Sequence, residues 1–369
     1  MTQLISRSDK LPESDNVQNI CCLMLAEIGD ILVTTPTIEE IKKLYPHAKL
    51  SVIIRKPIAR LLEGNPHIDE LILYDNSNFL TKSQLLLRLL FIRIDLWVDL
   101  HTPTFNTVCS NDEIFARNHL IQRFARPKYS IGFCKSDNLS THSHGLLFPD
   151  HQQMAEENIV STTMRLVRKD YISSDSQKYF HLFEQDKLWA LQNLPSSNEP
   201  FFLGIFFGSK QSVDIWPEHK VSELIHQLFI KYPISTILLL GGSAEKKTGD
   251  RLKSRFDKSH CILNFCGSAD LGQTGSLMTH CKLVVSTDSG PMHIADAMSV
   301  PLVTLFSSKN YLPVWLPVQS RFEALNIPVS CGPCFQSDCH QTIPCIEQIE
   351  PESVVEAITR VMEMDKAAI

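Results

Sequence analysis

The chain of 369 residues lacks features that would place it in several specialised classes. It has no basic excess: 35 Lys and Arg against 41 Asp and Glu give a formal net charge of −6. A nucleic-acid binder needs a basic face, so this balance argues against nucleic acid as a partner. No apolar run approaches the roughly 18 residues of a transmembrane helix. Glycine and proline together are 34 residues, too few for a fibrous or disordered chain. The polar residues 1–19 lack the apolar core of a signal peptide.

Two common nucleotide-binding motifs are also missing. Neither G-x-G-x-x-G nor G-x-x-x-x-G-K-[ST] occurs, which argues against dehydrogenases and P-loop enzymes. No two aspartates have the D-x-D spacing that often holds a divalent metal on a nucleotide-sugar diphosphate. A bound diphosphate would then be neutralised by a helix N-terminus and by basic side chains.

What the chain does contain is eleven cysteines. An odd count without a signal peptide indicates a reducing cytoplasm. Seven are scattered, several of them in apolar runs, where a thiol serves as a small core residue. The other four form a C-x2-C-x4-C-x5-C cluster, which could hold a structural zinc or iron or be a reduced, metal-free loop: Cys331, Cys334, Cys339 and Cys345.

Short apolar runs alternate with helical patterns along the chain, which predicts βαβ units and parallel sheets, an α/β fold. The helical patterns include 38–44, 221–230 and 293–298. The predicted strands are Ile20–Leu25, Leu50–Ile54, Leu71–Tyr74, Leu96–Leu100, Phe201–Phe207, Thr236–Leu240, Leu283–Ser286 and Leu302–Phe306.

We expect two α/β domains with a ligand cleft between them. The polar stretch QNLPSSNEP is the best candidate linker. The predicted divisions are a polar extension 1–19, a first Rossmann-like domain 20–191, a linker 192–200, a second Rossmann-like domain 201–350 and a C-terminal helix 351–369.

The segment Leu85–Leu100 has two interpretations. It is strongly apolar but carries Arg88, Arg93, Asp95 and Asp99. The first interpretation is a helix that leads into a buried strand. The second is a helix whose arginines contact anionic lipid headgroups.

In open α/β sheets, ligands bind beyond the carboxyl ends of the strands. After the first predicted strand comes Gly29, which permits a tight turn, and then Asp30 at the start of a helix. Asp30 could cap that helix or act as a general base, and the nearby Glu27 is a second candidate base.

A second strand end carries the string STDSGPMH. Ser289 or Gly290 suits a helix cap, and Pro291 suits the first helical position. The helix N-terminus would form an anion site suited to a diphosphate. Asp288 could bind ribose hydroxyls, and His293 could reach a phosphate or pack in the core.

These strings resemble the ADP-heptose:lipopolysaccharide heptosyltransferase family (glycosyltransferase family 9). The similarity runs from IGDILVTTPTIEEIKKLYPHAKL through IDLWVDLH to STDSGPMHIADAMSVPLVTLF and the cysteine cluster. It implies a GT-B fold, with an acceptor-side first domain and a donor domain, and an inverting, metal-independent transfer of heptose from ADP-heptose to a hydroxyl of a lipid-linked lipopolysaccharide core. It implies Asp30 as the base and Asp288, Ser289, Gly290 and His293 as donor-binding residues. It also suggests a Gram-negative cytoplasmic protein, peripheral on the inner membrane.

The chain departs from the family at two positions. Met24 stands where many members have a basic residue, and Asp214 stands where many have a lysine that reaches the donor phosphates. An aspartate there would repel a diphosphate, and Lys210 or Lys309 could replace the lost cation. The alternatives are therefore another nucleotide-sugar donor, a protein or glycan acceptor, or a nucleotide-sugar-binding homologue without catalysis.

On the acceptor side we expect Gly29 and Thr34, together with the basic residues Arg55, Lys56 and Arg60. The three basic residues follow the second strand and could meet acidic sugars or phosphates, or could simply be solvated.

Overall fold

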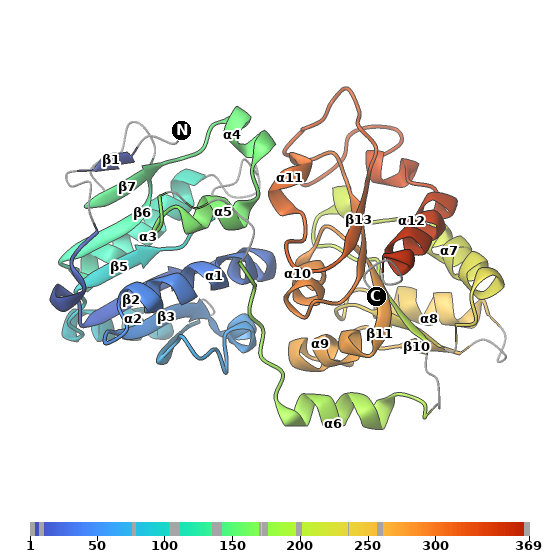
Figure 1. Ribbon diagram of the computed structural model, residues 1–369, viewed down its shortest axis with the longest axis horizontal. Helices are drawn as coiled ribbons and strands as arrows, with labels where there is room; N and C mark the ends of the chain where they lie inside the picture. Colours follow the sequence, from blue (N-terminus) through green and yellow to red (C-terminus); the bar gives the residue numbers. More distant parts are fainter. Residues whose placement is uncertain are drawn as a thin grey trace. The chain divides into compact units, whose positions relative to one another are not determined.

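The computed structural model (Figure 1) describes residues 4–6, 11–75, 79–102, 111–134, 142–169, 171, 176–196, 201–234, 236–256 and 261–364, with only the backbone described at 4–6, 79–80 and 111–112. The chain divides into two compact units, Met1–His181 and Leu182–Ile369. Of the sequence predictions, Cys109, part of the predicted linker (197–200) and the last five residues lie outside the described residues.

The first unit contains a seven-stranded sheet with the order β1-β7-β6-β5-β2-β3-β4. All its neighbouring strands are parallel except β1, which pairs antiparallel with β7. From β4 to β7 the order is that of a classical dinucleotide-binding fold. The strands are β1 Leu4–Ser6, β2 Asn19–Met24, β3 Lys49–Arg55, β4 Glu70–Tyr74, β5 Leu96–Asp99, β6 Tyr129–Cys134 and β7 His144–Leu147.

Helices cover both faces of this sheet, as the almost fully buried central strands require. Cys21 and Leu23 of β2 pack against Leu85 and Leu89 of α2, in one cluster with side chains of α3. Neighbouring positions on a strand point to opposite faces, so Met24 faces α1. The helices are α1 Ile28–Leu44, α2 Phe79–Phe91, α3 Asn111–Ala125, α4 His151–Glu156 and α5 Ile159–Met164, with 3-10 helices η1 Ser14–Asn16 and η2 Lys56–Leu61.

The second unit contains a six-stranded parallel sheet with the order β10-β9-β8-β11-β12-β13. This is the same classical order. The elements are α6 Glu184–Asn193, β8 Phe202–Phe206, η3 Ser212–Asp214, α7 Glu218–Lys231, β9 Thr236–Leu240, α8 Lys246–Ser254, β10 Ile262–Asn264, α9 Leu271–Thr279, β11 Cys281–Thr287, α10 Gly290–Ala297, β12 Leu302–Phe306, α11 Leu312–Trp315, β13 Phe322–Asn326, η4 Cys345–Gln348 and α12 Pro351–Glu363.

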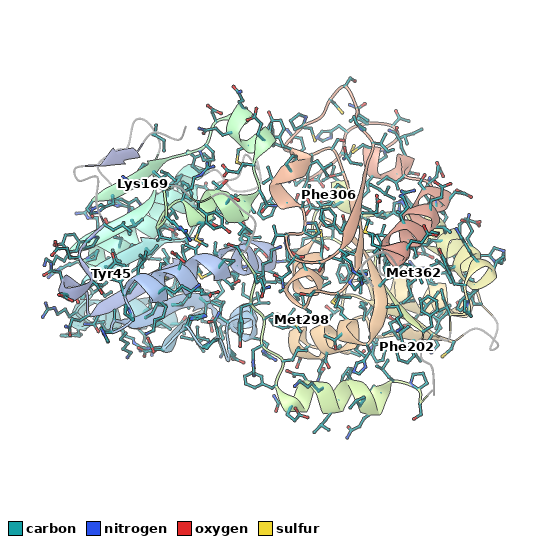
Figure 2. The ribbon with its side chains drawn as sticks, viewed as in Figure 1. Tyr45, Lys169, Phe202, Met298, Phe306 and Met362 are labelled. Carbon is teal, nitrogen blue, oxygen red and sulfur yellow. The ribbon has the colours of Figure 1, made fainter. Side chains whose placement is uncertain are left out.

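Each unit has its own hydrophobic core. In Figure 2, Tyr45 marks the end of α1 in the first unit, and Phe202 and Phe306 mark the start of β8 and the end of β12 in the second. In each sheet the strand order reverses at a central strand, β2 or β8. Ligands of such sheets bind at the carboxyl ends beside that reversal. Asp30 follows β2 and Asp288 follows β11, so both predicted site segments lie at such an edge.

The α/β class and the parallel sheets predicted from the sequence are confirmed, and the helix-then-strand interpretation of Leu85–Leu100 is confirmed by α2 and β5. The division between the units lies ahead of the expected linker 192–200. The reason is α6, which packs on α9 of the second unit, with the ring of Trp189 5.8 Å from that of Phe265. Among the described residues, no helix has the length and apolar character needed to cross a bilayer.

Candidate active site

Asp30 lies just past the carboxyl end of β2, as the third residue of α1. Its Oδ2 accepts a hydrogen bond of 3.2 Å from the backbone N–H of Glu27, and its Oδ1 accepts one from the hydroxyl of Thr102. The carboxylate therefore caps the helix, as one interpretation of the sequence allows. Each oxygen retains further lone-pair capacity, so the cap does not prevent Asp30 from accepting a proton.

The surroundings of Asp30 make it a stronger base than a solvated aspartate. Burial raises its pKa and the negative charge of Glu27 raises it further, whereas the hydrogen bonds from Thr102 and the backbone lower it; the net change is upward. Glu27 is itself held by Arg55, whose Nη2 lies 2.9 Å from Glu27 Oε1 and 2.5 Å from the carbonyl oxygen of Ala26. A carboxylate with a raised pKa suits general-base chemistry.

The remaining residues expected on the acceptor side lie in different surroundings. Gly29 is on the first turn of α1 beside Asp30, and Lys56 is exposed at the start of η2. Arg60 donates a 3.0 Å hydrogen bond to the carbonyl of His181 and lies over the Phe180 ring, 5.4 Å from its centroid. These contacts tie Arg60 to the end of the first unit.

Thr34, also expected on the acceptor side, is buried on the face of α1 that packs on the sheet. Its hydroxyl donates to the carbonyl oxygen of Ile31 at 2.8 Å, within the helix. This position favours a packing role over contact with a ligand.

Sequence reasoning missed a polar array at the end of β5. The Asn118 amide nitrogen lies 3.0 Å from both carboxylate oxygens of Asp99, and the backbone N–H of His101 donates to Asp99 at 3.1 Å. Burial raises the pKa of Asp99 to about 6. Because β5 pairs directly with β2, the residues after β5 bring Thr102 to Asp30. The pairing of these two strands is the signal that could have located Thr102.

In the second unit, the candidate donor site lies between β11 and α10. Ser289 is the N-cap residue of α10, and its hydroxyl donates 3.2 Å to the carbonyl oxygen of Thr287. The Thr287 hydroxyl in turn donates 3.1 Å to the carbonyl of Gly208, which follows β8. Asp288 continues the sheet through a 3.0 Å hydrogen bond from its N–H to Leu305. These bonds hold the loop ends of neighbouring strands at one edge of the sheet.

Asp214 is not the isolated negative charge that the sequence suggested. It is 1% exposed and forms an ion pair with the ammonium of Lys309, which also donates 2.9 Å to Gln211 Oε1. Ser307 donates a 2.5 Å hydrogen bond to the other oxygen of Asp214. The expectation that Asp214 would repel a diphosphate is corrected by this pairing, because Lys309 neutralises the carboxylate.

Lys309 also interacts electrostatically with Asp288. Burial lowers the pKa of Lys309, but the negative charges of Asp214 and Asp288 outweigh that effect, so its pKa is raised. The ammonium therefore stays protonated at the edge of the sheet where Asp288 lies.

The two other donor candidates differ in exposure. Lys210 is exposed, shortly after the end of β8. His293 is 2% exposed, and its ring packs edge-on against Trp315 with centroids 5.7 Å apart. Of the two interpretations of His293, the structure favours packing in the core.

The four clustered cysteines differ in their exposure to solvent. Cys331 is exposed, Cys334 and Cys339 are partly buried, and Cys345 is buried with its Sγ accepting a 3.1 Å hydrogen bond from the N–H of Ser308. In the part of the chain that the structure describes, no three His, Cys, Asp or Glu side chains form a group that could hold a metal ion. Burial raises the pKa of the Cys345 thiol, and the charges of Cys339 and Cys334 raise it further, so these sulfurs lie near one another. The metal-bound and the metal-free interpretations of the cluster both stay predictions.

The model of the family described as glycosyltransferase family 9 (heptosyltransferase) matches residues 117–343, more than half of the chain. Lipopolysaccharide heptosyltransferase 3 of Escherichia coli K12 is 25% identical over 295 residues, which cover 78% of this chain and 82% of that protein.

Solved structures show the same fold. A glycosyl transferase family 9 protein from Veillonella parvula superposes with a TM-score of 0.74 and 18% identity, covering 94% of this chain and 98% of that one. The ADP-heptose lps heptosyltransferase II of E. coli gives a TM-score of 0.73 and 19% identity, covering 95% and 100%. The predicted GT-B fold is thereby confirmed.

Proposed function

The chain belongs to glycosyltransferase family 9, and from that premise we propose that it transfers heptose from ADP-heptose to a hydroxyl of a lipid-linked lipopolysaccharide core. The observation that carries the proposal is Asp30, a carboxylate of raised pKa at the carboxyl edge of the first sheet. Two of the relatives described above are lipopolysaccharide heptosyltransferases, and one of them is an ADP-heptose enzyme, which supports this choice of donor and acceptor.

The chemistry is a single displacement that inverts the anomeric centre. The acceptor hydroxyl oxygen forms a bond to the anomeric carbon of the heptose while the bond from that carbon to the phosphate oxygen of ADP breaks. The hydroxyl proton passes to Asp30, and ADP leaves with the electron pair. A general base of this kind contributes about 10²–10⁴-fold to the rate.

The second unit binds the donor in this proposal. The N-terminus of α10, at Ser289 and Gly290, receives the diphosphate, and Asp288 binds the ribose hydroxyls. The exposed Lys210 supplies positive charge for the leaving ADP, and Lys309, paired with Asp214, keeps that carboxylate from repelling the diphosphate. Fixed charges and dipoles that meet developing negative charge are a large part of catalysis in many enzymes.

We also propose that the transfer needs no metal ion. The support is the absence of a D-x-D pair from the sequence together with the cations and the helix N-terminus already named. The protein would work in the cytoplasm on the inner face of the membrane, where a lipid-linked acceptor is made available.

The test is calorimetric titration of the full chain with ADP and with ADP-heptose, without added metal, followed by a transfer assay on a lipopolysaccharide-core acceptor with a chelator present. We expect both ligands to bind and the assay to proceed with inversion. Failure of both ligands to bind at millimolar concentration would refute the ADP-heptose donor, and a panel of other nucleotide sugars would then identify the alternative. Binding of ADP-heptose without transfer to any core acceptor would favour a non-catalytic homologue.

A further inference from the structure

Helix α2 exposes an apolar stripe that the proposed chemistry does not use. Leu85 and Leu89 are buried against the sheet, whereas Leu87, Leu90 and Phe91 are 56%, 39% and 87% exposed. The spacing of the three exposed residues puts them on one side of the helix. An almost fully exposed phenylalanine beside two exposed leucines is costly in water, which points to a partner for this side of the helix.

Basic residues lie in the same stretch of the chain as the stripe. The run from 79 to 94 contains Lys82, Arg88 and Arg93 and no acidic residue, in a chain whose net charge is −6. The side chain of Arg93 is 82% exposed. Its Nε lies 3.2 Å from Asp95, a carboxylate that is only 3% exposed and also accepts two backbone hydrogen bonds. The guanidinium of Arg93 is therefore exposed to solvent, whereas the carboxylate of Asp95 is buried.

Helix α3 also carries exposed apolar and basic residues. It packs against α2, and after Asp112 and the exposed Glu113 in its first turn the run from 114 to 134 has no acidic residue. Leu120 is 53% exposed, and Arg123 and Lys128 are exposed near the end of the helix. We call these residues the α2/α3 surface: Leu87, Arg88, Leu90, Phe91, Arg93, Leu120, Arg123 and Lys128.

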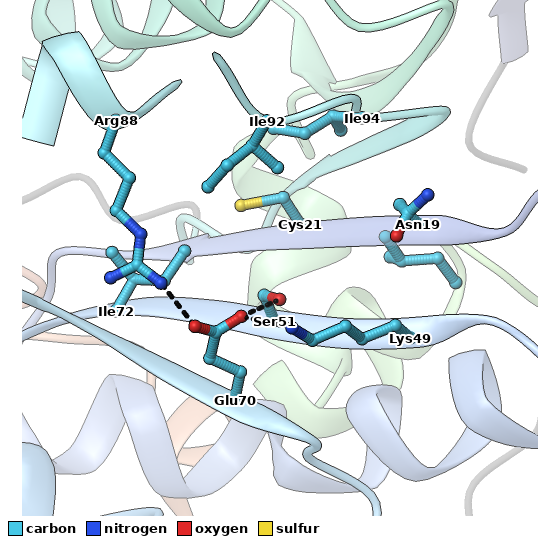
Figure 3. A pocket seen from close by; sticks show the side chains of 10 residues that line it. Asn19, Cys21, Lys49, Ser51, Glu70, Ile72, Arg88, Ile92 and Ile94 are labelled. Carbon is cyan, nitrogen blue, oxygen red and sulfur yellow. Dashed lines mark hydrogen bonds and ion pairs between the residues drawn. The ribbon is translucent and has the colours of Figure 1, made fainter. Parts of the chain in front are cut away.

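Beside the stripe is a pocket of about 220 Å³ at the starts of β2, β3 and β4. In Figure 3 the Arg88 guanidinium and the Lys49 ammonium both point toward the carboxylate of Glu70. Lys49 lies 2.8 Å from Glu70, and Arg88 forms a second ion pair with it. Two cations share one carboxylate, so the mouth of this pocket has a net positive charge.

We propose that the α2/α3 surface docks the protein on an anionic lipid bilayer. Leu87, Leu90 and Phe91 enter the interface between headgroups and acyl chains, and the arginines contact the headgroup phosphates. Charge complementarity selects this occupant, because exposed apolar residues beside the exposed Arg93, Arg123 and Lys128 match an anionic membrane. The purpose of docking rests on the proposed function, since a lipid-linked acceptor is presented at a membrane.

The position of the surface relative to Asp30 fits such an acceptor. The pocket and the end of α2 lie where the strands of the first sheet start, and Asp30 lies where β2 ends. A strand of six residues spans about 20 Å. A docked protein would hold Asp30 away from the headgroups, at a distance that the sugars of an oligosaccharide can bridge.

The test is sedimentation of the full chain with vesicles of phosphatidylglycerol and phosphatidylethanolamine, compared with phosphatidylcholine vesicles. We expect binding to the anionic vesicles alone, weakened by added salt. Phe91→Ser should lower the partition coefficient about tenfold. Arg93→Gln combined with Arg123→Gln should lower it at least about tenfold. Ile230→Ser is the matched control, because Ile230 is 73% exposed but lies on α7 of the second unit.

Three outcomes would overturn the proposal: no binding of the unaltered chain to anionic vesicles, equal binding by the Phe91 and Ile230 variants, or a dimer in sedimentation velocity that Phe91→Ser dissociates. The last would assign the stripe to a second copy of the chain. Transfer to a lipid-free, water-soluble core acceptor should be unchanged in every variant. If that transfer is absent from the unaltered chain, the proposed function fails while the vesicle result still stands.

Discussion

At the scale of single residues, Asp30 and Thr102 make a pair whose effect on activity depends on pH. The base must be ionised, so the rate should fall as pH decreases through the pKa of Asp30. The Thr102 hydroxyl bond lowers that pKa. Thr102→Val should therefore move the acidic limb of the kcat/KM profile to higher pH, with the plateau largely kept. Asp30→Asn should lower kcat at least about 100-fold.

The control for this pair is donor binding. ADP should bind the unaltered chain, Thr102→Val and Asp30→Asn with equal affinity in calorimetry, because neither residue belongs to the second unit. A profile for Thr102→Val that overlays the unaltered one would remove Asp30 from the role of base.

The ion pair of Asp214 and Lys309 should contribute to stability because both side chains are buried. Asp214→Asn leaves the ammonium of Lys309 without its counter-charge, and we expect the free energy of unfolding to fall by about 3–5 kcal/mol. Adding Lys309→Met to Asp214→Asn should restore much of that loss. Urea denaturation of the two single variants and the double variant measures the coupling.

An exposed ion pair provides the comparison. Lys43 and Glu39 are 2.7 Å apart on α1 with side chains 61% and 35% exposed. Glu39→Gln should cost less than about 1 kcal/mol. Equal losses from Glu39→Gln and Asp214→Asn would mean that burial of the Lys309 pair has no energetic consequence.

Single residues also mark the limit of what the sequence could predict about the site. Asp30 and Asp288 could be selected because each follows an apolar strand within a distinctive string. Lys309, the partner of Asp214, could not be selected from the sequence. The two residues are far apart along the chain and come together only through the order of the strands. Thr102 was also missed, although the pairing of β5 with β2 could have placed it beside Asp30.

At the scale of elements, α1 continues through Pro36 with the help of a threonine. Proline has no N–H to donate to the carbonyl oxygen of Leu32. The Thr35 hydroxyl donates to that oxygen at 2.7 Å and accepts a 2.9 Å hydrogen bond from the N–H of Tyr179. Thr35→Val should leave two buried polar groups unsatisfied and lower the free energy of unfolding by about 3 kcal/mol.

The neighbouring Thr34 is the matched control on the same helix. It is equally buried, but its hydroxyl donates to Ile31 and no backbone N–H donates to it among the described residues. Thr34→Val should therefore cost less than Thr35→Val in the same chemical denaturation experiment. Equal costs would indicate that burial of a methyl group, and not the bridge across Pro36, sets the stability of this turn.

Most strands in the middle of each sheet could be predicted because they are apolar on both faces, although the interior strand β6 was missed. The runs around Ile20, Val98 and Leu203 are fully buried, and continuous apolar sequence is typical of such strands. The edge strands β10 and β13 could not be predicted in this way. β10 has three residues, and every residue of β13 is partly exposed, so neither has a continuous apolar run.

At the scale of the whole molecule, the two units have the same strand order but different chemistry at their carboxyl edges. The first carries a carboxylate of raised pKa, and the second carries a helix N-terminus with a buried ammonium beside it. The division between them was harder to predict than the fold, because α6 follows the boundary and has too few buried residues to indicate the unit to which it belongs.

This separation predicts which strands ADP should protect. A ligand that binds only the native second unit stabilises it by about 2.7 kcal/mol at a concentration of 100 times Kd. In hydrogen–deuterium exchange, amides of β8, β11 and β12 should exchange more slowly with ADP, while those of β2, β3 and β5 should be unchanged. Lys309→Met should reduce the protection, since it removes a cation next to Asp288. Protection of β2 and β3 in place of β11 and β12 would assign the nucleotide to the first unit and reverse the proposed roles of the two sheets.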